Sequence, residues 1–239
     1  NFSELNTELI VELQQELKAG KIDDAVAISN DLKENSEKIN HHGKRAESIV
    51  KGMLEHSRKA SGVKEPTDIN KLCDEFVRLS YHGLRAKDKG FNCDYKLDLD
   101  PSIPLVNVVS QDIGRVILNI VNNAFQACFQ QSESLKSESQ EMYTPLVTLK
   151  TRLNIKDKNS VPVSLCEISI ADNGPGIPAH IKDKIFQPFF TTKPTGQGTG
   201  LGLSLAYDIV KAHGGSIKVE SYSSQSGTPD GTISINSKE

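Results

Sequence analysis

The apolar residues of the first 60 positions recur at helical spacing and predict two helices joined by a short turn. One stripe ends at Gly20, a residue that often terminates helices; it consists of Phe2, Leu5, Leu9, Leu13 and Leu17. A second helix, which Asp23 can cap, carries two rows with a seven-residue period. The rows are Ala25, Leu32, Ile39, Ala46 and Met53, and Ile28, Asn35, His42, Ile49 and His56.

The two predicted helices have about 18 and about 36 residues, or about 27 and about 54 Å. A hairpin buries its seam best when its helices match in length, so half of the longer helix needs another cover. We therefore interpret residues 1–60 as a dimerisation hairpin, half of a dimeric four-helix bundle. We expect a second copy of the chain to cover the free half, and the first helix to be truncated at residue 1.

The segment 61–68, SGVKEPTD, contains Gly, Pro and a capping Asp and predicts a hinge into a second domain, residues 69–239. Beyond it the pattern is mixed, and the stretch 131–141 is polar and predicts an exposed loop. The irregular order of helices and strands favours an α/β sandwich, and the whole chain is expected to be α+β. Helices are predicted for 68–84, 111–130 and up to about residue 213, and strands for 91–100, 104–109, 145–155, 163–172, 216–221 and 231–236.

Composition excludes several functions. A net charge of −3 gives no basic surface for nucleic acid. No apolar run reaches the roughly 18 residues of a membrane span, and the first residues do not resemble a signal peptide. The four dispersed cysteines lack metal-ligand spacing and predict free thiols in a reducing cytoplasm. We expect a cytoplasmic location, with any membrane attachment through regions outside this chain.

The segment LNIVNNAFQA (118–127) places Asn119 and Asn123 one turn apart on one helical face. Two amide oxygens there suit Mg²⁺, which takes few protein ligands and completes its octahedron with phosphate oxygens and water. An isolated pair of this kind is more often polar surface or a helix cap, so the pair gains weight only with its neighbours.

Two glycine-bearing segments follow. In ISIADNGPGIP (168–178), a strand delivers Asp172, and Gly174 and Gly176 then permit close backbone approach to a ligand. A carboxylate held there can accept from an exocyclic amino group such as that of adenine. In GQGTGLGLSLAYDIV (196–210), alternating glycines precede a helix whose N-terminal N–H groups suit a polyphosphate. Leu201 stands where a dinucleotide fingerprint needs Gly or Ala, and no P-loop is present.

The intervening stretch FQPFFTTKPTG (186–196) is interpreted as a mobile lid. Apolar anchors are provided by Phe186, Phe189 and Phe190. Polar groups available to phosphates are Thr191, Thr192 and Lys193.

Taken in this order, four segments resemble the N, G1, F and G2 boxes of the Bergerat-type ATPases, and they are most similar to those of sensor histidine kinases. The segments are NIVNNA, DNGPGIP, FQPFFTTK and GTGLGLSLAYDIVKAHGG, and the resemblance covers residues 66–236. The resemblance implies that Asp172 binds the adenine amino group and that Asn123 holds Mg²⁺, with Asn119 beside the phosphates and a possible second ligand. Asn119 and Lys193 are the implied catalytic residues. The implied ATP-binding set is Asn119, Asn123, Gln126, Asp172, Gly174, Gly176, Ile177, Thr191, Thr192, Gly198, Thr199, Gly200, Leu201, Gly202 and Thr232.

One position bears on the reaction. The hydrolytic branch of the superfamily has a Glu one turn before the Mg²⁺ Asn, where it can act as a general base. This chain has Asn119 there, and imidazole needs no such base. The resemblance therefore implies transfer of the ATP γ-phosphate to a histidine and relay to an Asp of a response regulator receiver domain. The alternative is a nucleotide-dependent binding module without phosphotransfer; an ATP-hydrolysing machine is disfavoured.

The acceptor histidine is not evident. INHHGKRAESIVKGMLEHSR (39–58) resembles the second helix of the family's dimerisation hairpin, whereas the acceptor belongs to an HExxxP-type box on the first. No His followed by an acid occurs in residues 1–40, so we expect the acceptor upstream and disfavour His42 and His41, which fit a polar layer in the seam. His213, at a helix C-terminus, is interpreted as a cation favoured by the helix dipole.

Overall fold

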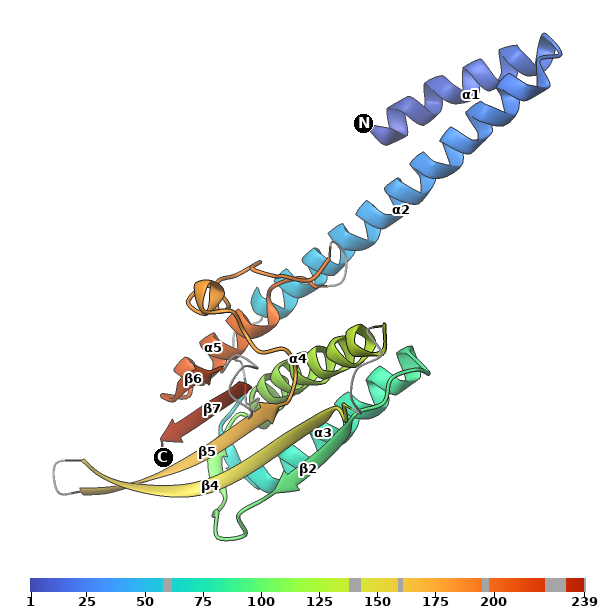
Figure 1. The fold of residues 1–239 in the computed structure, drawn as a ribbon. Helices are drawn as coiled ribbons and strands as arrows, with labels where there is room; N and C mark the ends of the chain where they lie inside the picture. The colour runs from blue at the N-terminus through green and yellow to red at the C-terminus, as the bar shows by residue number, and fades with distance from the viewer. Residues whose placement is uncertain (58–61, 138–142, 159–160, 195–197, 222–230, 239) are drawn as a thin grey trace. The chain divides into compact units, whose positions relative to one another are not determined.

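The computed structural model describes residues 1–57, 62–137, 143–158, 161–194, 198–221 and 231–238 (Figure 1). The chain forms two compact units. One comprises Asn1–Ser57 together with Thr191–Thr199, and the other comprises Arg58–Phe190 together with Gly200–Glu239. The predicted α+β class, a helical hairpin followed by an α/β sandwich, is confirmed.

The hairpin consists of α1 (Phe2–Lys18) and α2 (Ile22–Ser57). Asn1 and Glu4 form a capping box at the start of α1, which satisfies N–H groups that a helix start leaves without partners. Gly20 has a φ of 71° in the turn, as its predicted role as helix terminator requires. The prediction that Asp23 caps the second helix is wrong, because α2 begins at Ile22 and Asp23 lies in its first turn.

The seam between the helices is buried only where α1 reaches it. Ala25, Ile28 and Asn35 of α2 are buried, and Leu9 and Leu13 of α1 are half-buried. Ile39, level with the first residues of α1, is 38% exposed. Beyond α1 the apolar side chains are open, since Val50 is 54% exposed and Leu54 64%. The predicted stripe on the first helix is only partly right, because Phe2, Leu5 and Leu17 are exposed. The side chains of Ile49, Met53 and His56 lie outside the described residues.

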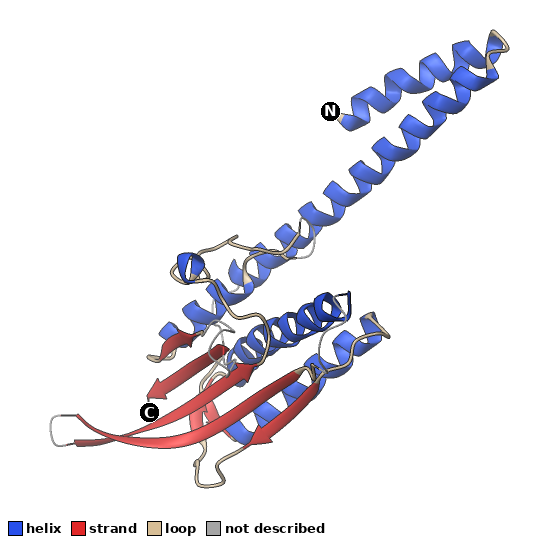
Figure 2. Ribbon diagram, in the orientation of Figure 1, coloured by secondary structure: helices blue, strands red, loops and turns tan. Residues whose placement is uncertain are grey.

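The second unit contains a sheet of five strands in the order β2-β4-β5-β7-β6. The strand β2 pairs parallel with β4, and the remaining pairs are antiparallel. Three helices cover one face of this sheet (Figure 2). The strands are β2 (Asp94–Asp98), β4 (Leu146–Lys158), β5 (Val161–Asp172), β6 (Ser216–Glu220) and β7 (Gly231–Lys238); the helices are α3 (Ile69–Lys87), α4 (Ser110–Ser137) and α5 (Gly202–Ala212), with a 3-10 turn η1 (Ala179–Ile181).

Side chains from all three helices and the sheet share one core. The covered positions of β4 and β5, such as Val147, Leu149 and Ile170, alternate with outward polar residues. All four cysteines are free thiols, as the sequence predicts, and all four are buried. In the described parts of the chain, no helix combines the length and apolar character that a membrane span needs.

Two predicted segments differ from the structure. The segment 61–68 was expected to be only a hinge, but it contains β1 (Glu65–Thr67), which pairs antiparallel with β3 (Val106–Val108). Pro66 is tolerated in that strand because the sheet has only two strands, each with a free edge. The loop predicted for 131–141 is helical as far as Ser137, since Glu, Leu and Lys there favour a helix. Residues 138–142 lie outside the described residues.

Candidate nucleotide-binding site

The amides predicted to bind Mg-ATP lie along one face of α4. Asn119, Asn123 and Gln126 occupy positions i, i+4 and i+7, and all three are half-buried. The rest of the helix faces the core through Val116, Ile117, Ile120, Val121, Ala124, Phe125 and Cys128. The amide face is thus kept out of the core by the apolar periodicity of the same helix.

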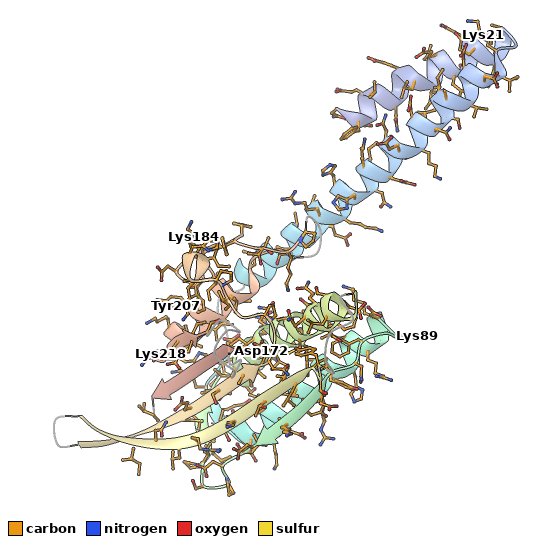
Figure 3. All side chains as sticks on the ribbon, viewed as in Figure 1. Lys21, Lys89, Asp172, Lys184, Tyr207 and Lys218 are labelled. Carbon is orange, nitrogen blue, oxygen red and sulfur yellow. The ribbon has the colours of Figure 1, made fainter. Side chains whose placement is uncertain are left out.

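Asp172, labelled in Figure 3, is the last residue of β5 and is half-buried. Its Oδ1 accepts the N–H of Gly174 at 3.0 Å. A Cβ on Gly174 would stand 2.8 Å from that oxygen and 3.0 Å from the Cβ of Ala127 on α4. A side chain at position 174 would crowd both the carboxylate and α4, so glycine favours the close approach of the loop after β5 to this helix.

The glycines before α5 bring that helix to the same face of α4. Gly200 has a φ of 67°, and a Cβ there would stand 2.4 Å from the carbonyl carbon of Phe189. Gly202 begins α5, and a Cβ on it would lie 3.3 Å from Oδ1 of Asn119. The first N–H groups of α5 have no carbonyl partner within the helix, which makes this end suited to an anion.

The predicted residues of the sandwich therefore line one helix in a defined order. The Asp172–Gly174 loop lies against α4 at Ala127, and the first residue of α5, Gly202, lies beside Asn119 of α4. The two contacts are eight positions apart on the helix, or about 12 Å. Asn123 lies midway between them.

The first residues of β7 complete this edge of the sheet. Thr232 pairs with Ala171 of β5 and with Glu220 of β6, and Gly231 pairs with Asp172. The backbone of Thr232 therefore lies one pair away from Asp172, while its side chain is outside the described residues. In the loop after β5, Gly176 has a φ of 75° and the N–H of Ile177 donates to Oγ of Ser221 at 2.7 Å.

The remaining predicted residues, Thr191, Thr192, Lys193, Gly198 and Thr199, lie in the segment that clusters with the hairpin. Within it, Oγ of Thr191 accepts the N–H of Lys193 at 3.1 Å. A Cβ on Gly198 would stand 3.0 Å from Oγ of Thr191, so the two ends of the segment approach each other. Gly196 lies outside the described residues.

The predicted lid anchors are partly confirmed. The centroid of the Phe186 ring lies 5.5 Å from that of Tyr207 on α5; Tyr207 is labelled in Figure 3. Phe189 is 49% exposed, so it is no anchor. It has a φ of 67°, which is rare for a residue with a side chain, and its carbonyl is the group that approaches Gly200.

The donor set fits a magnesium ion that is held mainly by its substrate. Among the described residues no three His, Cys, Asp or Glu side chains converge as a metal site. Asn123 offers one amide oxygen, and Asn119 lies one turn away. Mg²⁺ bound through few protein groups and substrate phosphates requires no more than this.

Two residues near Asp172 carried no assigned role in the sequence. Oδ1 of Asn173 accepts the N–H of Leu146 at 2.8 Å, and the hydroxyl of Tyr143 lies 3.0 Å from the same oxygen. Asn173 belongs to the DNGPGIP motif, but an Asn between Asp and Gly is also an ordinary turn residue. Tyr143 follows a polar stretch, and nothing in the local sequence relates it to position 173.

The interpretation of His213 as a helix-terminal cation is wrong. The side chain is buried, its Nδ1 lies 2.8 Å from the carbonyl oxygen of Ile209, and its Nε2 lies 3.2 Å from the N–H of Val109. Because Nε2 accepts from a backbone donor, it carries no proton, and Nδ1–H donates to Ile209. The neutral ring fastens the end of α5 to the residue before α4.

Comparisons with known proteins agree with this geometry. The sequence profile described as "Histidine kinase-, DNA gyrase B-, and HSP90-like ATPase" matches residues 108–235. The chain is similar to the sensory histidine kinase/phosphatase NtrB of Rhizobium leguminosarum bv. phaseoli, with 30% identity over 214 residues that cover 88% of this chain and 50% of that protein. It is also similar to the sensor kinase CckA of Brucella abortus (strain 2308), with 32% identity over 195 residues that cover 77% and 18%.

The solved structure of full-length ShkA in complex with AMPPNP has a TM-score of 0.58 at 18% identity, and the match covers 99% of this chain and 45% of that one. At this identity the likeness concerns the fold alone. The chain spans half or less of the length of these three proteins. The profile covers more than half of the chain, and the sequence relatives are sensor kinases. This chain therefore belongs to the histidine kinase-, DNA gyrase B- and HSP90-like ATPase family, and it carries the ATP-binding catalytic domain of a sensor histidine kinase.

Proposed function

We propose that this chain binds Mg-ATP and transfers the γ-phosphate to a histidine, from which it passes to an Asp of a response regulator receiver domain. The observation that carries the proposal is the approach of two glycine segments to one face of α4. Gly174 contacts Ala127, and Gly202 contacts Asn119. A nucleotide laid along this face would have Asp172 at its base and the start of α5 at its phosphates.

Each side chain then has one task. The Asp172 carboxylate accepts from the adenine amino group, and Asn123 holds Mg²⁺ through its amide oxygen. The ion, when bound, neutralises charge on the phosphate oxygens. The N–H groups at the start of α5 bind the phosphates, and Lys193 contributes a positive charge from the lid segment.

Transfer to histidine is favoured over hydrolysis because position 119 is an amide. Asn119 cannot take a proton from water, whereas an imidazole nitrogen already carries a lone pair and needs no base. Asn119 therefore positions phosphate without activating a solvent nucleophile. Catalysis then consists of alignment and charge stabilisation, as is usual for phosphoryl transfer.

We propose that the acceptor lies in an H box that is not within these 239 residues. None of the six histidines is followed by an acidic residue. The His42 ring is stacked on Phe2 at a centroid distance of 6.3 Å and an interplanar angle of 12°, and it also contacts His41. These contacts support a structural role for His42. We further propose that the hairpin forms a homodimer and that this part of the protein is cytoplasmic.

Phosphotransfer can be tested by adding a separate hairpin that bears an HExxxP box to the chain with γ-labelled Mg-ATP. We expect label on the added histidine, detected by mass spectrometry at alkaline pH, and none with Asn123→Ala. Binding of ATP without labelling of any hairpin tested would support the alternative, a nucleotide-dependent binding module. Stoichiometric label on His42 would instead place the acceptor within this chain.

A further inference from the structure

Asn173, directly after Asp172, forms hydrogen bonds through both its backbone and its side chain. Its N–H donates to the carbonyl oxygen of Leu146 at 3.2 Å, and its Oδ1 accepts the N–H of Leu146 at 2.8 Å. Its Nδ2 donates to the carbonyl oxygen of Thr144 at 2.8 Å. These bonds extend the pairing of β4 with β5 by one residue beyond Asp172.

Tyr143 holds the same residue from a second direction. Its hydroxyl lies 2.9 Å from the carbonyl oxygen of Asn173 and 3.0 Å from Oδ1, so one O–H is shared between both oxygens. Burial raises the pKa of Tyr143, which keeps the phenol protonated and therefore a donor. Sγ of Cys128, on α4, lies 3.3 Å from the same Oδ1. Groups from α4, from β4 and from the segment before β4 thus converge on Asn173.

We propose that Tyr143 and Asn173 are positioning residues that aim the Asp172 carboxylate at the amino group of adenine; this rests on the proposed role of Asp172. The bonds to both sides of residue 173 fix the peptide that leaves Asp172. They also fix the path to Gly174, whose N–H orients Oδ1 of Asp172. A carboxylate that is already oriented loses less conformational freedom when the base binds.

Tyr143→Phe tests the proposal by removing one oxygen atom. Affinities are measured for ATP and for purine riboside triphosphate, which is ATP without the 6-amino group. We expect the Kd for ATP to rise about threefold to tenfold, the range of one lost hydrogen bond. The Kd for purine riboside triphosphate is expected to stay unchanged. The ratio of the two Kd values, which measures the preference for the 6-amino group, should therefore become smaller. Asn173→Ala should reduce this preference for the 6-amino group further.

Two matched variants remove similar groups elsewhere in the same domain. Tyr81→Phe deletes a phenol oxygen on α3, and Asn154→Ala removes a cross-strand bond to Glu167 far along β4. Both should keep the wild-type preference. Thermal melting of every variant shows whether it is folded, and if Asn173→Ala is not, Tyr143→Phe alone decides.

The outcomes separate the two proposals. If Tyr143→Phe weakens both nucleotides equally, or leaves the preference intact, Tyr143 does not orient Asp172 and the inference is wrong. If the wild-type chain binds both nucleotides equally well, Asp172 does not recognise the amino group, and the adenine contact assigned under the proposed function fails with it. A preference that Asp172→Asn abolishes and Tyr143→Phe narrows supports both.

Discussion

Asn119 lies beside the first residue of α5, with its Oδ1 3.3 Å from the position of a Cβ on Gly202. Its side chain is therefore held where the helix N-terminus would meet phosphate. A carboxylate at this place would face both the anion and a solvent molecule near it, whereas an amide only positions them. The choice between water and histidine as the phosphate acceptor is thus expected to depend on whether residue 119 carries an amide or a carboxylate.

Asn119→Glu is expected to raise ATP hydrolysis without acceptor by about tenfold to a hundredfold, since a positioned general base is worth at least that. Phosphate release measures it. Asn119→Gln, which lengthens the side chain equally but leaves it neutral, should not raise hydrolysis. Equal release by both variants would remove the argument that the amide favours transfer to histidine.

His213→Ala tests the neutral histidine that joins α5 to Val109. We expect the free energy of unfolding to fall by about 1–3 kcal/mol, because the buried N–H of Val109 loses its acceptor. Urea denaturation measures this. His82→Ala, at an exposed position on α3, should change the value by less than about 0.5 kcal/mol. Equal losses in the two variants would show that the Val109 bond adds nothing.

At the scale of elements, a closed set of hydrogen bonds joins α3, the segment after β2 and β4. The N–H of Asp100 donates to Oγ of Thr151 at 3.0 Å, and Thr151 donates to Oδ1 of Asn70 at 2.7 Å. Nδ2 of Asn70 donates to the carbonyl oxygen of Asp100 at 2.8 Å, which closes the set. Thr151 is fully buried, so these groups depend on one another rather than on water.

Thr151→Val keeps the shape of the side chain and removes the hydroxyl. The Asp100 N–H loses its acceptor and Asn70 loses its donor, so we expect a loss of about 1–3 kcal/mol in the free energy of unfolding. Thr148→Val, on the uncovered face of the same strand, is the control and should have little effect. A loss no larger than that of Thr148→Val would contradict the network's importance.

Most elements could be predicted because their signals are local. Asp68 was expected to start a helix, and it caps α3 by accepting the N–H of Lys71 at 3.0 Å. The strand β1 was not expected, because it depends on pairing with β3 some 40 residues away, and a short stretch with Pro66 gives no local sign of that. The face shared by Asn119 and Asn123 follows from helical spacing, whereas the bonds of Tyr143 to Asn173 depend on the tertiary fold.

For the whole molecule, we expect the hairpin to determine association. The predicted heptad rows of α2 are buried at Ala25 and Ile28, but Ile39 of the first row is 38% exposed, and Leu54, outside both rows, is 64% exposed. Apolar side chains left open along a long helix are typical of a surface that another helix pair covers. This supports the proposed dimer and indicates where its contacts lie.

Ile39→Asp is expected to weaken the dimer by at least tenfold in Kd, because a charge buried without a partner in the seam costs well over 1.4 kcal/mol. Analytical ultracentrifugation over a dilution series measures it. Val26→Asp is the control, since Val26 is exposed on α2 but lies outside both heptad rows. Equal weakening by the two variants, or an unaltered dimer with Ile39→Asp, would show that the open row is not the interface.

The helix α4 carries contacts to both ends of the site, at Asn119 and at Ala127. A helix turns by about 100° per residue, so inserting or deleting one residue between them would rotate one contact away from the other. Natural variants of this domain should therefore keep the count of residues between these positions fixed while tolerating changes of length after Cys128. Relatives that keep this number of residues, even where the residue types differ, should bind nucleotide in the same way.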